Sequence, residues 1–231
     1  MNQVSTQALC RTSTPLLGLY LVKRLSTFAL TLVTLTCSAF SYALSPLNFN
    51  VWIDERKMGT HRYTFETLDS ASDTFRVISE ADFKVKVLLV TVFNYQHTAI
   101  ETWQGNCLQA LESETTTNGK EEEIDLELPA EDCAGTYTYW DKERLRRPML
   151  TNTQTGKAEP TTWTDLGLVS LPTIGKKKNV KGHSGDVQGI ALTTPSAGFR
   201  LYYSDTGELL MMQTENDSRT ITYLHDSLKA K

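Results

Sequence analysis

The feature that most restricts the fold of this chain is the alternation of apolar and polar residues in "TFRVISEADFKVKVLL", residues 74–89. Successive side chains of a β-strand point to opposite faces, so a period of two predicts a long strand with one buried face. That face would carry Phe75, Val77, Ala81, Phe83, Val85, Val87 and Leu89. A one-sided strand of this length needs other parts of the chain to cover its apolar face.

The same alternation recurs along the chain. Ile124, Leu126 and Leu128 alternate with acidic residues, and "NFNVWID" and "THRYTFET" are expected to form two strands joined around Gly59. Near the C-terminus, "FRLYYSD", "ELLMMQTE" and "RTITYLH" predict a meander with turns at 205–207 and 216–218. We therefore predict a mainly β fold, a curved antiparallel sheet forming a barrel or half-barrel, with one or two short helices or loops covering its mouth.

Helical signals are few. The best candidate begins at Asp141, which could act as an N-cap, and continues through "KERLRR" to Pro148. A weaker helical or turn signal lies in "TTWTDLGLVSL", residues 161–171. Both are short, so helix is expected to contribute little to the fold.

The N-terminus is typical of an export signal. Lys23 and Arg24 precede the apolar run "LSTFALTLVTLTCSAF", and Ser41-Tyr42-Ala43 supply the small residues that a signal peptidase recognises. We predict cleavage after Ala43, which leaves residues 44–231 as a single β-rich domain in the periplasm or outside the cell. An uncleaved membrane anchor and a lipoprotein modified at Cys37 are the alternatives. The run is short and rich in threonine for a bilayer span, so no stable membrane span is expected after cleavage.

Charge restricts the partners of the remaining domain. Residues 1–43 contain three basic residues and no acidic one, so 20 Lys and Arg remain against 27 Asp and Glu, a net charge of −7. This charge argues against nucleic acid as the main partner. His61, His183 and His225 lack the His-x-His or His-Glu-x-x-His spacing of metal centres, so no metal or cofactor is predicted.

Cleavage would remove Cys10 and Cys37 and leave an even pair, Cys107 and Cys133, in an oxidising compartment. Between them, "CLQALESETT" and "EEEIDLELP" flank Asn118-Gly119, a strong signal for a two-residue hairpin turn. Folding about this turn brings Cys107 close to the segment that ends in Cys133. We therefore predict a disulfide that closes the open end of the hairpin.

The segment "YQHTAIETWQGNC", Tyr95 to Cys107, combines residue types that are common in catalytic and metal sites. Its density of threonine, isoleucine and aromatic residues favours a strand, on which His97 and Glu101 lie roughly 13 Å apart. That spacing excludes a shared proton or metal ion. Its side chains would instead form a half-buried face of the sheet. The alternative is that they line a ligand cavity together with the preceding strand, through Phe83, Val85, Phe93, Tyr95, His97, Glu101 and Trp103.

Several blocks together are similar to a known family. They are "FNVWID", "FNYQHTAIETWQGNCLQAL", "CAGTYTYWD", "LTNTQTGK" and "LYYSDTGEL". The chain from Phe49 to Leu224 resembles exported proteobacterial proteins known only as a domain of unknown function. The resemblance implies export, a β-rich fold and paired cysteines, and it implies no active site.

Three function classes remain open. The first is a soluble binding protein whose concave sheet face holds an apolar small molecule or a lipid. The second is a structural or partner-binding protein of the cell envelope without a small ligand. The third is a hydrolase-like enzyme that uses His97, Glu101 and Asp141 from different elements. Asn152, Gln154 and Thr155 suit a tight loop that bonds its own backbone, or else a loop that binds substrate.

Overall fold

The fold is described by a computed structural model that covers residues 45–87, 90–176, 178–216 and 219–231. The expected signal peptide, residues 1–43, lies outside this range, as do Leu89 and part of the turn expected at 216–218. Within the described range the chain is almost entirely β-structure, with one short 3-10 helix at Ala130–Asp132. No helix in this range is long and apolar enough to cross a bilayer.

Eleven of the described strands form one antiparallel sheet in the order β6-β5-β4-β3-β2-β1-β14-β13-β12-β11-β9. Its first half contains the long strands β2 (Arg56–Asp69), β3 (Thr74–Val87), β4 (Val90–Gln104), β5 (Cys107–Thr117) and β6 (Lys120–Glu127). Its second half contains β1 (Leu47–Ile53), β9 (Thr162–Val169), β11 (Val187–Thr193), β12 (Gly198–Tyr203), β13 (Leu209–Asn216) and β14 (Arg219–His225). Two short pairs complete the structure: β7 (Met149–Thr151) with β8 (Ala158–Pro160), and β10 (Val180–Lys181) with β15 (Lys229–Ala230).

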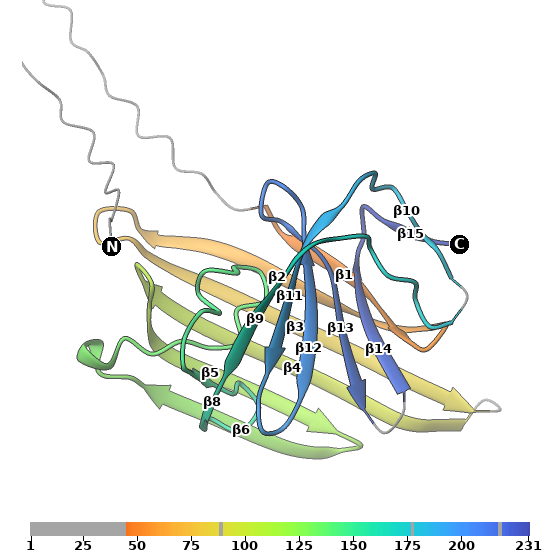
Figure 1. Cartoon of the computed structure of the whole chain (residues 1–231). Helices are drawn as coiled ribbons and strands as arrows, with labels where there is room; N and C mark the ends of the chain where they lie inside the picture. The colour runs from red at the N-terminus through yellow and green to blue at the C-terminus, as the bar shows by residue number, and fades with distance from the viewer. Residues whose placement is uncertain (1–44, 88–89, 177, 217–218) are drawn as a thin grey trace, which may run out of the picture. The chain divides into compact units, whose positions relative to one another are not determined.

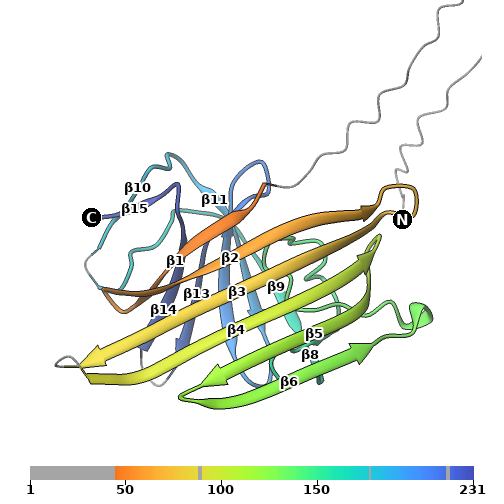
Figure 2. The ribbon, with the colours of Figure 1, turned by 180° about the vertical axis from the view of Figure 1, so that it is seen from behind.

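The sheet curls until its two halves face each other. Figures 1 and 2 show β9 and β11–β14 crossing the long strands β2–β6 on one side. Register shifts at Val51/Trp52, Thr102/Trp103 and Tyr202/Tyr203 mark bulges, which bend strands and increase their twist. The edge strands β6 and β9 do not pair with each other, so the sheet is a half-closed barrel, as the alternating pattern predicts.

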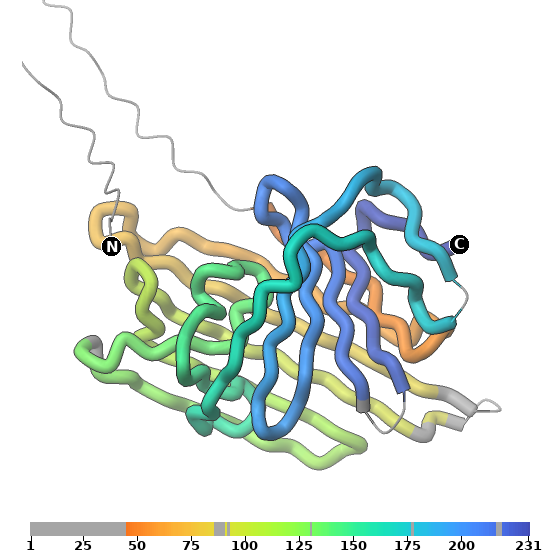
Figure 3. Tube along the Cα trace, in the orientation of Figure 1, coloured from red at the N-terminus to blue at the C-terminus, as the bar shows by residue number. Residues whose placement is uncertain are grey.

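The segment between the two edge strands fills part of the barrel interior. We call residues 128–161 the plug, and Figure 3 follows its path between β6 and β9. Its Trp140, Leu145 and Leu150 are buried in the same apolar core as Trp103 and Leu108. The plug is thus the middle segment that was expected to cover the mouth, and it does so mostly with turns and loops.

Two features predicted from the sequence are present: the tight turn between β5 and β6, and the disulfide that ties β5 to the plug. Asn118 and Gly119 have positive φ angles of 52° and 83° between the paired residues Thr117 and Lys120, the backbone that a tight hairpin turn requires. Cys107 and Cys133 form a disulfide with their Cα atoms 4.5 Å apart. The disulfide ties the first residue of β5 to the beginning of the plug.

The expected helix after Asp141 is absent from the described plug, which forms turns there. One helix-like backbone bond, from Leu145 N to Asp141 O at 3.3 Å, is present. A segment of this length before a proline is too short to propagate a helix. Its arginines bind carbonyl groups elsewhere: Arg144 binds that of Gly105, and Arg147 that of Cys133.

Two further expectations need correction. The stretch with the weaker helical signal is strand β9, which pairs with β11 across a bulge where Gly167 has a φ of 71°. The turn between the first two strands lies at Asp54 and Glu55 rather than around Gly59. Gly59 lies inside β2, where a Cβ atom would come within 2.0 Å of the Asp82 carbonyl oxygen. The glycine therefore serves close strand packing and not a turn.

Candidate functional site

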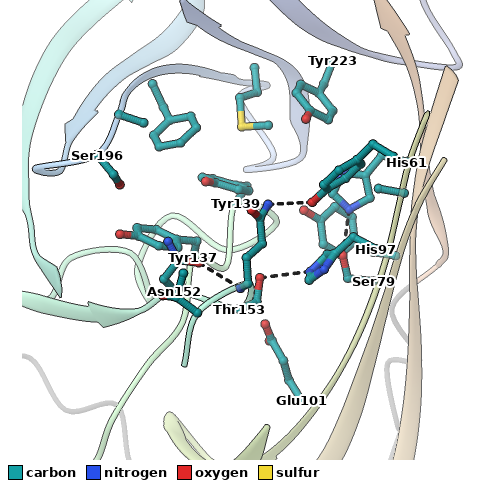
Figure 4. A pocket seen from close by; sticks show the side chains of 18 of the residues that line it. His61, Ser79, His97, Glu101, Tyr137, Tyr139, Asn152, Thr153, Ser196 and Tyr223 are labelled. Atoms are coloured by element: carbon teal, nitrogen blue, oxygen red, sulfur yellow. Dashed lines mark hydrogen bonds between the residues drawn. The ribbon is translucent and has the colours of Figure 1, made fainter. Parts of the chain in front are cut away.

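A cavity of about 450 Å³ lies between the long strands, the plug and the second half of the sheet. Residues of β2, β3 and β4 form one side, which we call the sheet wall: His61, Tyr63, Ser79, Ala81, Phe83, Tyr95, His97 and Glu101. The plug, the β11–β12 loop and β12 form the other side, which we call the plug wall: Tyr137, Tyr139, Asn152, Thr153, Gln154, Thr155, Glu159, Ser196, Ala197 and Phe199. Met212 and Tyr223 complete the lining. Figure 4 shows labelled side chains from both walls around this space.

Aromatic rings give each wall its surface. On the sheet wall, the rings of Phe83 and Tyr95 stack with centroids 5.2 Å apart, and Phe83 also meets Tyr223 edge-on at 6.0 Å. On the plug wall, Tyr139 contacts Phe199 at 5.2 Å and stacks on Tyr137 at 6.1 Å. Burial raises the pKa of the tyrosine hydroxyls on both walls, so they remain neutral donors and acceptors at physiological pH.

Two histidines on the sheet wall are buried and neutral. The His61 Nε2 and the Ser79 hydroxyl are hydrogen-bonded at 2.7 Å, and burial lowers the pKa of His61 to about 3. His97 bonds the hydroxyls of Thr115 at 2.8 Å and Thr153 at 3.1 Å, and burial lowers its pKa to about 4. Both imidazoles act as fixed polar groups that hold strands and plug together.

Glu101 supplies a carboxylate at the inner end of the cavity, with only 4% of its surface exposed. Its Oε1 accepts a hydrogen bond of 2.7 Å from Thr136 of the plug, and its Oε2 accepts one of 2.9 Å from the indole of Trp103. Burial raises the pKa of Glu101, while these two hydrogen bonds and the positive charge of Arg144 act in the opposite direction. The carboxylate is therefore held by donors on two sides.

A second carboxylate, Glu159, lies on the plug wall. Its Oε2 accepts hydrogen bonds from the hydroxyls of Tyr137 at 2.7 Å and Ser196 at 2.9 Å, and its Oε1 accepts one from Asn152 at 3.1 Å. Desolvation alone would raise the pKa of Glu159, but the three hydrogen bonds together lower it. Glu159 is thus an ionised group at physiological pH.

Of the seven residues that the sequence places along a concavity, Phe83, Tyr95, His97 and Glu101 line the cavity, and Val85, Phe93 and Trp103 do not. Phe93 lies two residues before Tyr95 on β4, and the two rings stack with their centroids 6.4 Å apart. Trp103 is fully buried behind Glu101, parallel to the ring of Phe75 at 6.4 Å. Its indole supports the wall of the cavity without forming part of its surface.

Sequence analysis did not predict several of the lining residues, namely His61, Tyr63, Tyr137, Tyr139, Glu159, Phe199 and Tyr223. The alternation of Tyr137 and Tyr139 in "TYTYWD" is a signal for two tyrosines on one side of an extended segment. The loop of Asn152 and Gln154 bonds its own backbone, which is one of the two interpretations that the sequence left open. The Asn152 side chain accepts a hydrogen bond from the Gln154 backbone at 2.9 Å, and both residues line the cavity.

The geometry does not unite the residues of the enzyme hypothesis. Asp141 caps the turn after it by accepting hydrogen bonds from the Glu143 and Arg144 backbones, and it is not among the cavity residues. The two nitrogens of His97 are bonded to threonines, and Glu101 to Thr136 and Trp103. Within the described part of the chain, no three His, Cys, Asp or Glu side chains come together as they would around a metal ion.

Comparison with known proteins adds a family and a fold. The profile of a family described as a domain of unknown function (DUF6134) matches residues 49–225. A crystal structure of a β-barrel-like protein of another domain of unknown function (DUF1849), from Brucella abortus, superposes with a TM-score of 0.52 and 10% identity, over 80% of this chain and 97% of that one. The crystal structure of LprF from Mycobacterium bovis covers 79% of this chain and 84% of its own, at 10% identity and a TM-score of 0.26. No curated protein matches the sequence.

Proposed function

Since the chain belongs to this family, described as a domain of unknown function (DUF6134), we propose a function from its cavity: an exported binding protein that holds one small amphiphilic molecule. The observation that carries the proposal is the cavity of about 450 Å³ between two aromatic walls. Strands, plug and the β11–β12 loop all contribute to its walls, so the fold leaves a concave space that a molecule from solution could occupy.

The lining determines the character of that occupant. Binding sites for small molecules typically measure about 300–1,000 Å³ and combine apolar surface with a few fixed polar groups. Here the rings of Tyr139, Phe199 and Phe83 supply apolar surface, and histidine, asparagine and glutamate side chains supply the polar groups. Because polar groups and aromatic rings alternate around the same space, the lining suits a ligand that carries both polar and apolar parts.

We propose that a ligand enters the cavity between the plug and the β11–β12 loop. Gln154, Thr155 and Ser196 line the cavity and are exposed on the surface. Gln154 donates a 2.6 Å hydrogen bond to the Tyr95 hydroxyl across the two walls. Opening this contact would widen the entrance without disturbing the sheet.

Export forms the second part of the proposal. We propose that residues 1–43 are a signal peptide and that the remaining domain acts in the periplasm or outside the cell. The disulfide between Cys107 and Cys133 supports an oxidising compartment, because disulfides rarely persist in the cytosol. A ligand in that compartment would be collected from the cell envelope or from the medium.

Native mass spectrometry of the protein purified from the periplasm tests the binding function. We expect a fraction of the protein to carry one extra mass that organic solvent removes. Ala197→Phe places a ring in the cavity, since Ala197 lines it, and should abolish the extra mass. Ala71→Phe, in the exposed turn between β2 and β3, is the matched control and should retain it. A ligand-free protein in repeated preparations would contradict the proposal and favour a partner-binding protein of the envelope.

A further inference from the structure

The charges and rings around the cavity are consistent with a narrower ligand class. Among the described residues that line it, the acidic side chains are Glu101 and Glu159, and none is lysine or arginine. The two histidines are neutral at physiological pH because burial lowers their pKa to about 3 and about 4. Glu159, whose pKa is lowered by its hydrogen bonds, therefore gives this lining a negative charge.

The aromatic rings add to this preference. The faces of tyrosine and phenylalanine rings carry negative electrostatic potential, and they attract a cation within about 6 Å of the ring centroid. The cavity presents such rings from opposite sides, with Tyr137, Tyr139 and Phe199 on the plug wall and Tyr63, Phe83 and Tyr95 on the sheet wall. Figure 4 shows Tyr137 and Ser196 on one side of the space, and His61 and His97 on the other.

Glu159 is positioned to pair with a positive charge on the ligand. Its three hydrogen bonds come from Tyr137, Ser196 and Asn152, all of which line the same wall. These bonds fix the carboxylate beside the pair of stacked tyrosines, whose ring centroids are 6.1 Å apart. A carboxylate next to aromatic rings is suited to an ammonium group with apolar substituents, because the substituents pack on the rings while the charge meets the carboxylate.

We propose that the cavity binds an organic cation, a quaternary or alkylated ammonium compound, between its two aromatic walls and beside Glu159. This inference rests on the proposed binding function and narrows it to one ligand class. An anionic ligand would meet the ionised Glu159 and, among the described lining residues, no lysine or arginine. A neutral ligand would leave the carboxylate of Glu159 without a partner of opposite charge.

The test compares choline with 3,3-dimethylbutan-1-ol, in which carbon replaces the charged nitrogen and the shape is unchanged. Isothermal titration calorimetry on the mature protein, freed of any co-purified ligand, should give a Kd for choline about tenfold or more below that for the alcohol. Glu159→Gln should remove most of this preference with little effect on the alcohol. Tyr139→Leu, which removes a ring face, should weaken choline binding more than Tyr139→Phe, which keeps it.

Glu80→Gln is the matched control, because Glu80 is exposed on the outer face of β3 next to Ser79. It should retain the preference for choline, and circular dichroism should show that each variant is folded. Equal or tighter binding of the alcohol would overturn the cation proposal and leave the binding function standing. Failure of both probes to bind, or a preference for choline that survives in Glu159→Gln and Glu101→Gln, would also overturn it. The mass of a co-purified ligand decides the binding function separately.

Discussion

The indole Nε1 of Trp103 donates a 2.9 Å hydrogen bond to Oε2 of Glu101, two positions earlier on the same strand. Both side chains point to the interior, as positions two apart on a strand must. The other oxygen of Glu101 accepts a hydrogen bond from Thr136, so this carboxylate connects the sheet to the plug. The pair explains why a fully buried tryptophan lies behind a buried acid: the indole is the donor that the carboxylate needs.

Removing that donor should destabilise the protein. Trp103→Phe retains most of the apolar surface but leaves Oε2 of Glu101 without its partner, and we expect the free energy of unfolding to fall by about 2 kcal/mol. Trp103→Ala should cost about 3–5 kcal/mol because it also creates a cavity. Urea denaturation of the purified variants measures both. Trp163→Phe, at a partly exposed position on β9, serves as the control and should change stability by less than about 1 kcal/mol.

Because its buried histidines are neutral, the folded protein should lose stability as the pH falls. The pKa of His97 is about 4 in the folded protein against 6.5 without burial, so between these pH values the unfolded chain binds more protons. The free energy of unfolding should therefore decrease as pH falls from about 6.5 to about 4, by roughly 3 kcal/mol from this residue. His97→Gln, which cannot titrate, should flatten the curve in this window. An unchanged pH dependence in His97→Gln, with Gln96→Ala on the outer face as control, would contradict the assignment.

The disulfide predicts both a chemical and a thermodynamic result. Under denaturing, non-reducing conditions, Cys107 and Cys133 should resist alkylation, and reduction should make both reactive. Cys107→Ser combined with Cys133→Ser should lower the free energy of unfolding by about 3 kcal/mol, because the unfolded chain loses the constraint on the loop between them. Thermal unfolding with and without reductant checks this, since reductant should have no effect on the double variant.

Processing is predicted from Ser41-Tyr42-Ala43. N-terminal sequencing of the exported protein should begin at Leu44. A mature chain that begins with a lipid-modified Cys37, or one that retains Met1 in the membrane fraction, would contradict this.

The fold was more accessible from the sequence than the site, for a physical reason. Alternation in β3 and the turn at Asn118-Gly119 are local signals, and neighbours in the antiparallel sheet are mostly consecutive in the chain. Four of the seven expected lining residues lie on β3 and β4 and were found from strand periodicity alone. The plug wall depends on a long segment folding back into the barrel, and no periodic pattern specifies where Tyr139 or Glu159 will meet the strands. The helix predicted after Asp141 is absent, but the capping role predicted for Asp141 is present, because its side chain caps a turn.

Arg144 holds that turn against the barrel. Its guanidinium lies 5.2–5.5 Å from the ring centroids of Phe75, Trp103 and Trp140, forms an ion pair with Asp141, and donates a 2.9 Å hydrogen bond to the Gly105 carbonyl. Only 16% of its side chain is exposed. Arg146, two residues on, also lies over a ring, that of Trp163 at 4.1 Å, but 45% of its side chain is exposed.

The two arginines therefore form a matched pair for the last prediction. Arg144→Met keeps the stem but loses the charge, and we expect it to lower the free energy of unfolding by about 3 kcal/mol, because Asp141 and the Gly105 carbonyl lose a buried partner. Arg146→Met should cost less than about 1 kcal/mol, as an exposed ion pair and ring contact do. Arg144→Met should also raise the pKa of Glu101, since the positive charge of Arg144 lowers it in the wild-type protein. Infrared spectroscopy of the carboxyl stretch against pH would detect that increase, and an effect of equal size in Arg146→Met would show that Arg144 has no special role in holding the plug.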